Sequence, residues 1–95
     1  MEITNVRVRI QNKENSKLRG FAQVTIDDQF VVHDIRILEG TKGLFLAMPS
    51  KEVAPGEYRD TAHPITPEAR SIFENAIFAE YEKEKARSEE ETDEE

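Results

Sequence analysis

The chain has 95 residues, which predicts one small domain whose core is modest and could be enlarged by a second copy. It contains no cysteine, which excludes a disulfide framework, a thiolate zinc site and a thiol nucleophile. The net charge of -7 argues at first sight against a nucleic-acid partner, but residues 1–70 hold ten Lys/Arg and ten Asp/Glu, so the whole excess of carboxylates belongs to residues 71–95. With no apolar stretch of signal-peptide type at the start and no run of membrane-spanning length, we expect a cytoplasmic protein.

Residues 3–10 have the period-two alternation of a half-buried strand. Arg7 and Arg9 are predicted to form a basic outer side, opposite the apolar side of Val6, Val8 and Ile10. The polar residues 11–17 are expected to form a hairpin loop. A second strand over residues 18–26 resumes the alternation.

The third predicted strand, residues 30–38, follows a turn at Asp27-Asp28, because aspartate hydrogen-bonds to its own backbone where the chain reverses. Both of its sides carry apolar residues: Val31, His33, Ile35 and Ile37 on one, and Phe30, Val32, Asp34, Arg36 and Leu38 on the other. Such a strand is expected to be central in its sheet or covered at an interface.

A fourth short strand over residues 44–48 is predicted to end at Pro49, since proline cannot donate to a strand ladder. Pro55-Gly56 indicates a reversing turn, and a short fifth strand near residues 57–59 is expected after it. The short loops between these strands favour an antiparallel meander.

A helix is predicted to begin after Thr66, with Thr66 as N-cap, Pro67 at the first helical position and Glu68 in the first turn. One broad apolar stripe follows at helical spacing: Ala69, Ile72, Phe73, Ala76, Ile77 and Tyr81. Phe78 is expected to lie off that stripe. The predicted fold class is therefore α+β, with a meander of four to five strands and a packed C-terminal helix in residues 1–82.

Residues 83–95 are predicted to form a charged extension of the helix and a disordered acidic tail. Residues 82–87 can continue the helix, but residues 88–95 hold six carboxylates and no apolar side chain, so burial cannot offset the entropy of ordering them. One hypothesis is that this tail imitates a polyanion and competes for a basic patch on the folded part of the chain.

His63 is the residue that an enzyme or metal site would use first, because Asp60, Glu57 and Tyr58 are close to it in sequence. No second histidine lies nearby, and no nucleophile occupies a G-x-S-x-G turn. We therefore expect His63 to form a hydrogen bond that fixes its corner, and His33 to be a satisfied sheet residue. No catalytic residue, metal or cofactor is predicted.

Basic residues around the corner between sheet and helix favour a nucleic-acid partner. Lys42, Lys51 and Arg59 are placed in loops that could share one rim of the sheet, and Arg70 lies in the first turns of the helix. Phosphates are bound by such charges and by free N–H groups at a helix start. Arg59 could instead pair locally with Asp60, and the patch is diluted by four carboxylates, Glu52, Glu57, Asp60 and Glu68.

Three segments of the chain carry a specific pattern: FVVHDIRILEG at residues 30–40, GLFLAMPSK at 43–51 and GEYRDTAHPI at 56–65. They resemble the stage V sporulation protein G family, SpoVG, over residues 1–82. The resemblance implies a small bacterial regulator with a twisted antiparallel sheet, a C-terminal helix and a dimer formed through strand contacts. It also implies site-selective binding of DNA, binding of RNA, and a link to septation and sporulation control.

If the chain behaves like its relatives, Lys51 and Arg59 contact phosphates, and Thr66 to Arg70 lie at the groove or strand being read. Glu52 departs from the family, in which the position after MPSK is often basic. The helix start is a second departure, because relatives tend to carry asparagine and serine where this chain has Ile65-Thr66-Pro67-Glu68.

The sequence therefore predicts a non-enzymatic regulator that binds DNA, and also RNA, as a homodimer. The alternative is a protein–protein interaction module that acts on cell-division or regulatory proteins without nucleic acid. A hydrolytic or metal-dependent enzyme around His63 is the third reading. No small-molecule substrate and no membrane insertion are expected.

Overall fold

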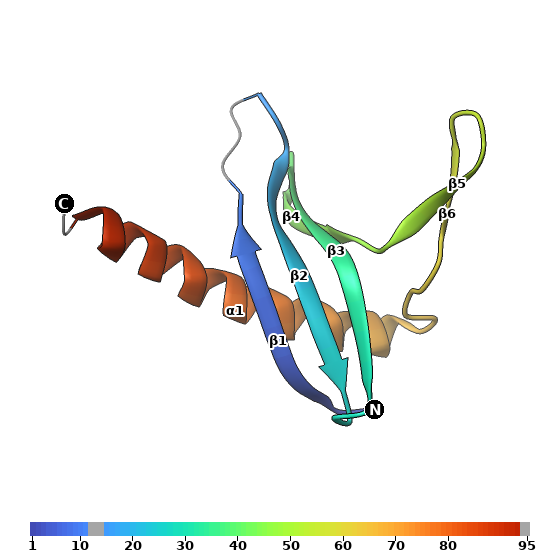
Figure 1. The fold of residues 1–95 in the computed structure, drawn as a ribbon, viewed down its shortest axis with the longest axis horizontal. Helices are drawn as coiled ribbons and strands as arrows, with labels where there is room; N and C mark the ends of the chain where they lie inside the picture. The colour runs from blue at the N-terminus through green and yellow to red at the C-terminus, as the bar shows by residue number, and fades with distance from the viewer. Residues whose placement is uncertain (12–14, 94–95) are drawn as a thin grey trace.

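A computed structural model describes residues 1–11 and 15–93, with side chains as far as Arg87, and it confirms the predicted α+β class. Within these residues an antiparallel sheet of order β1-β2-β3-β4 lies against one helix, and a separate two-stranded hairpin projects from it (Figure 1). The elements are β1 (Ile3–Ile10), β2 (Leu18–Ile26), β3 (Phe30–Gly40), β4 (Gly43–Ala47), β5 (Ser50–Ala54), β6 (Glu57–Asp60) and α1 (Pro67–Asp93).

The core lies between one face of the four-stranded sheet and α1, which crosses behind the sheet in the view of Figure 1. From the helix, Phe73, Ile77 and Tyr81 are buried, as the 3.6-residue period requires. The sheet contributes the remaining buried residues, Ala22, Val24, Val32, Ile35, Ile37 and Leu46, with Met48 just beyond β4. Fully burying one such side chain contributes roughly 1.5–3 kcal/mol, so these three helix residues are main contributors to the packing of α1 on the sheet.

Two details of the predicted helix stripe are wrong. Ile72, assigned to the stripe, is exposed, and Phe78, expected to lie off it, is half-buried against the core. The start of α1 is as predicted: Thr66 Oγ1 accepts a hydrogen bond from the Ala69 N–H at 3.0 Å, and the helix begins at Pro67.

The predicted sides of β3 are also wrong, because the strand contains a bulge at Asp34. This residue has φ +62°, and the pairing of β2 with β3 shifts register between Ala22 and Val24. One extra residue reverses the alternation, so Val32 joins Ile35 on the buried side and His33 turns to the exposed side. The expectation that β3 is an inner strand is confirmed, since β2 and β4 pair with its two edges.

The turn predicted at Asp27-Asp28 is confirmed. Both residues have positive φ, 52° and 54°, the arrangement of a tight hairpin turn whose twist matches that of its strands. The turn is tied to the start of the chain. The Glu2 N–H donates to Asp27 Oδ1 at 3.1 Å, and the Asp28 N–H donates to Thr4 Oγ1 at 2.9 Å.

The hairpin of β5 and β6 differs from the prediction, which placed only residues 57–59 in a strand. Residues 50–54 also form a strand, and every residue of the hairpin is exposed except the half-buried Ala54. The period-two signal is absent because neither side of the hairpin faces a core. At the base of the hairpin, the Thr61 N–H and Oγ1 donate to the Pro49 carbonyl, at 2.8 and 3.1 Å.

The C-terminal half of α1 extends past β1, beyond the edge of the sheet (Figure 1). The backbone of α1 is helical through Asp93, and the division of residues 83–95 into a helix extension and a disordered acidic tail stays a prediction. Residues 94 and 95, also assigned to the tail, lie outside the described residues. Among the described residues, no helix is both long and apolar enough to cross a bilayer.

Candidate nucleic-acid interface

The projecting hairpin brings two of the predicted basic residues together. Lys51 of β5 is paired with Arg59 of β6, so their side chains share one side of the hairpin with Cα atoms roughly 5 Å apart. Both are exposed, and no carboxylate of the described side chains lies within ion-pairing distance of either. Sequence reasoning placed Lys51 in a loop and Arg59 at the end of a short strand near that loop; the structure places both in paired strands, which fixes their mutual position.

The carboxylates expected to dilute this pair are divided between the two sides of the hairpin. Glu52 and Asp60 lie next to Lys51 and Arg59 along their strands, and successive strand residues point to opposite sides. Of the hairpin carboxylates, only Glu57 lies on the same side as Arg59, because it is two residues away along β6. The local ion pair considered between Arg59 and Asp60 is not among the ion pairs of the described residues.

Arg70 is engaged within the fold. Its Nη2 donates a hydrogen bond to the Leu46 carbonyl of β4 at 3.2 Å, and its Nε lies 3.8 Å from Glu74 Oε2. The guanidinium therefore secures the first turns of α1 to the sheet, and part of its charge is balanced by a carboxylate one turn further on.

The start of α1 has fewer free N–H groups than the sequence suggests. Pro67 has none, the Ala69 N–H is used by the Thr66 hydroxyl, and the Arg70 N–H donates to the Thr66 carbonyl at 3.0 Å. Of these first positions, Glu68 is the one whose N–H has no acceptor among the described residues. The Glu68 side chain adds a carboxylate beside that N–H. Anion binding at this helix start is correspondingly limited.

Lys42 is not part of the same group. It lies in the turn between β3 and β4, whereas Lys51 follows the opposite end of β4. Lys42, Lys51 and Arg59, which the sequence suggested could share one rim of the sheet, therefore do not form one group within a single chain. The structure joins Lys51 with Arg59, keeps Thr66 with Arg70 at the helix start, and leaves Lys42 apart.

The two histidines have the structural roles expected of them. His63 is exposed, and its Nδ1 is 3.1 Å from the Pro64 carbonyl, which accepts a hydrogen bond within the corner. His33 Nδ1 is 3.0 Å from Gln23 Oε1 on the neighbouring strand. No group of three or more metal-ligating side chains is present among the described residues.

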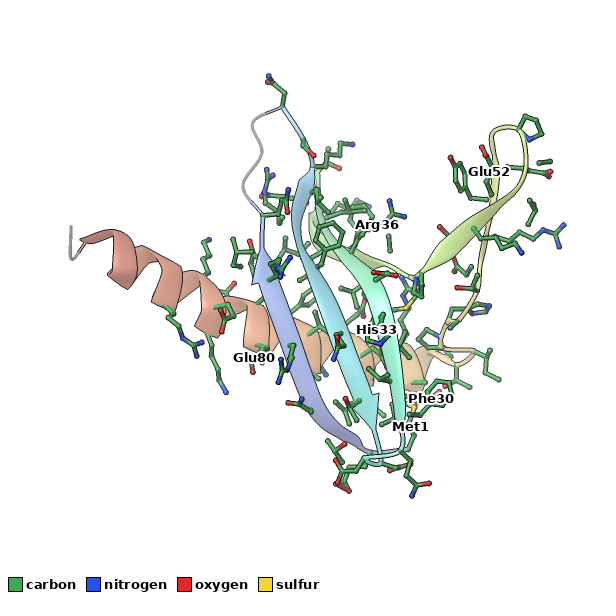
Figure 2. All side chains as sticks on the ribbon, viewed as in Figure 1. Met1, Phe30, His33, Arg36, Glu52 and Glu80 are labelled. Atoms are coloured by element: carbon green, nitrogen blue, oxygen red, sulfur yellow. The ribbon has the colours of Figure 1, made fainter. Side chains whose placement is uncertain are left out.

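Sequence reasoning missed a second basic surface on the face of the sheet that is turned away from α1. Arg7 and Arg9 were predicted to form a basic side of β1, and both are exposed there. Exposed Arg36, labelled with His33 on β3 in Figure 2, belongs to the same face, and Phe21 of β2 lies between these strands. Alternation alone could have placed Phe21 with the arginines, but the strand register was needed to join them.

Comparison with known proteins gives one family and a consistent set of relatives. The model of the SpoVG family matches residues 1–83. A protein of Alkaliphilus oremlandii is 52% identical over 83 residues, covering 87% of this chain and 88% of its own length. One of Oceanobacillus iheyensis is 52% identical over 83 residues, covering 87% and 85%, and one of Thermoanaerobacter sp. is 52% identical over 85 residues, covering 90% and 91%. All three names contain the words "septation protein SpoVG".

Proposed function

The chain belongs to the SpoVG family, and on that premise we propose that it is a non-enzymatic regulator of septation and sporulation that binds DNA, and also RNA, as a dimer. The names of its relatives support the link to septation. Because chromosomal DNA and RNA lie in the cytoplasm, we propose that the protein acts there. The proposed contacts are phosphate contacts of Lys51 and Arg59, with Lys42, Thr66 and Arg70 as further contacts.

The observation that carries the proposal is the pairing of Lys51 with Arg59 on a hairpin that projects from the rest of the molecule. Two exposed cations on one side of a narrow arm can approach a phosphate backbone without the folded body interfering. Glu52 and Asp60 lie on the other side of the arm and reduce this attraction less than their positions in the sequence suggest.

A dimer would present this pair twice, and two weak contacts on one nucleic acid reinforce each other through effective concentration. Two features of one chain favour association. β1 and β4 are the edge strands of the sheet and have backbone groups available for pairing. Ile65 is 87% exposed and Tyr58 65%, which is apolar surface that a partner chain could cover.

The proposal is tested by the salt dependence of binding to a random DNA duplex. Each phosphate contact contributes about -0.9 to the slope of log K against log salt, so Lys51→Ala/Arg59→Ala should flatten the slope by roughly 1.8 per copy bound. Lys85→Ala/Arg87→Ala is the matched control, because it removes two exposed cations from the far part of α1. An equal slope in both variants would contradict the proposal.

The second candidate function is a protein–protein interaction module, and the exposed apolar side chains of the hairpin and corner favour it. They are Val53, Tyr58 and Ile65. Absent or salt-insensitive binding of nucleic acid at micromolar protein would support this candidate over the first.

A further inference from the structure

The sheet face opposite α1, here called the open face, carries three arginines: Arg7 and Arg9 of β1 and Arg36 of β3. All three are exposed, while the residues that alternate with them along each strand contact the core. None has a carboxylate within ion-pairing distance among the described side chains. In a chain with an overall excess of carboxylates, this is a concentration of unbalanced positive charge.

The arginines are arranged around an aromatic ring. Arg9 pairs with Phe21, and Phe21 pairs with Arg36, so the three side chains form one row across β1, β2 and β3. Adjacent strands lie about 4.8 Å apart, so Phe21 has an arginine at the neighbouring position on each side of it. Arg7 extends this row along β1 and pairs with Gln23.

Phe21 lies where two shallow grooves of the open face meet. One groove, of about 540 Å³, runs beside Arg7 and Arg9. The other, of about 660 Å³, runs from Phe21 and Arg36 to Tyr58 at the hairpin. Phe21 is half-buried, whereas Tyr58 is an exposed ring at the far end of this groove, on the side of the hairpin that also carries Glu52 and Asp60.

The open face and the Lys51–Arg59 pair are separate surfaces. Tyr58 and Ser50 line the groove, and strand alternation directs Lys51 and Arg59 to the other side of the hairpin. A ligand on the open face consequently need not contact the pair, and each surface can be changed without the other.

Charge argues against a second copy of the chain as the occupant of this face. Asp34 is the only carboxylate among the residues that line the two grooves. If two copies packed these faces together, six arginines would be buried with only two groove-lining carboxylates, and such an excess of like charge at an interface is unfavourable. A polyanion with planar groups matches both the arginines and the rings.

Single-stranded nucleic acid has this chemistry. Its unpaired bases stack on aromatic rings presented by a sheet, and guanidinium groups bind its phosphates or stack on its bases. In a duplex the base faces are already stacked on one another and are not available to Phe21.

We propose that the open face binds single-stranded nucleic acid, with a base stacked on Phe21 between Arg9 and Arg36 and phosphates on the three arginines. This site does not depend on duplex binding by the hairpin. It assigns a role to three exposed arginines that form no ion pair among the described residues.

The experiment measures fluorescence anisotropy of labelled dT15 and rU15 with the full chain at several salt concentrations. Phe21→Leu keeps the apolar side chain but removes the ring, and we expect binding weakened about 5- to 150-fold, the effect of losing one base stack. Arg36→Gln should weaken binding and reduce the salt slope by about 0.7. Arg87→Gln, on the far part of α1, is the control and should change neither quantity for the open face.

Asp34→Asn is expected to strengthen binding, and a gain of binding cannot result from loss of folding. Asparagine tolerates the positive φ at this bulge, and the change removes the carboxylate that faces the grooves. We expect tighter binding of dT15 and rU15. Tighter binding by Asp34→Asn together with weaker binding by Phe21→Leu would support the site.

Three results would overturn the proposal. The first is that dT15 and rU15 fail to bind at 50 mM salt and about 100 μM protein, a range that includes ordinary non-specific affinities. The second is that they bind with no response to Phe21→Leu, Arg36→Gln and Asp34→Asn, or respond only to Lys51→Ala/Arg59→Ala. The third is that Phe21→Leu and Arg36→Gln dissociate a dimer in light scattering, which would make the open face a contact between copies.

Binding of duplex DNA distinguishes the open-face site from the hairpin site. Duplex binding that depends on Lys51 and Arg59 while single strands do not bind would leave the proposed function standing and remove the open-face site. Single-strand binding through Phe21 without duplex binding would support the open-face site and remove the hairpin proposal.

Discussion

Lys51 and Arg59 lie directly opposite each other on β5 and β6, so that two cations occupy neighbouring positions on one side of the hairpin. Like charges in this arrangement repel and destabilise a strand pair. Because the hairpin is exposed on both sides, packing does not require either residue. The fold therefore does not require two cations at these positions, and the phosphate contacts proposed for them would give them a use.

A first prediction follows for Lys51→Thr. Threonine favours strands and removes the repulsion, so the melting temperature should stay the same or rise slightly, by the equivalent of about 0.2–1 kcal/mol. Duplex binding should weaken in the same variant. Differential scanning calorimetry and anisotropy titration check the two effects, and a clear fall in melting temperature would show that Lys51 supports the fold.

The close approach of β1 and β2 at Gly20 yields a second prediction. A Cβ at this position would lie 2.6 Å from the Arg9 carbonyl oxygen, which belongs to the backbone and cannot rotate away. Gly20→Ala should therefore lower the free energy of unfolding by about 1–3 kcal/mol, measured by urea denaturation.

Gly40→Ala is the matched control for this change. Its nearest contact would be 3.0 Å from Cε1 of Phe45, an exposed ring that can move. A loss as large for Gly40→Ala as for Gly20→Ala would contradict the explanation by backbone contact.

The N-cap of α1 provides a third prediction. Thr66→Ala removes the hydroxyl that accepts the Ala69 N–H and should lower the free energy of unfolding by about 0.5–2 kcal/mol. Thr66→Ser retains the acceptor and should stay close to the parent. Chemical denaturation followed by circular dichroism distinguishes them, and equal stability of all three chains would argue against a role of this cap.

The turn between β2 and β3 leads to a fourth prediction. Asp28 has φ +54°, which glycine adopts without the steric penalty of a side chain, so Asp28→Gly should stabilise the protein by a few tenths to about 1 kcal/mol. Its backbone hydrogen bond to Thr4 is unaffected by the change.

Asp27→Gly is the comparison for this turn. It has the same conformational advantage but loses the hydrogen bond from the Glu2 N–H to the Asp27 carboxylate. We expect a smaller gain than for Asp28→Gly in thermal unfolding. The reverse order would indicate that the carboxylate bond contributes nothing to stability.

The sequence by itself determined the elements that could be recognised from residues close together in the chain. The alternation in β1 and β2, the turn at Asp27-Asp28 and the start of α1 at Thr66 and Pro67 each depend on neighbours only a few residues apart. Such local preferences are expressed in the side chains themselves, so they can be recognised without coordinates. The resemblance to the SpoVG family was likewise recognisable from the residues of three short segments.

Only the tertiary structure decided which residues share a surface. The bulge at Asp34 arises where β2 and β3 pair, and it reversed the sides assigned to Val32 and His33. Strand register joined Lys51 with Arg59, and the position of the first turns of α1 near β4 gave Arg70 a carbonyl partner, that of Leu46. Register and packing depend on contacts between residues distant in sequence. They therefore cannot be recognised from a local pattern of side chains.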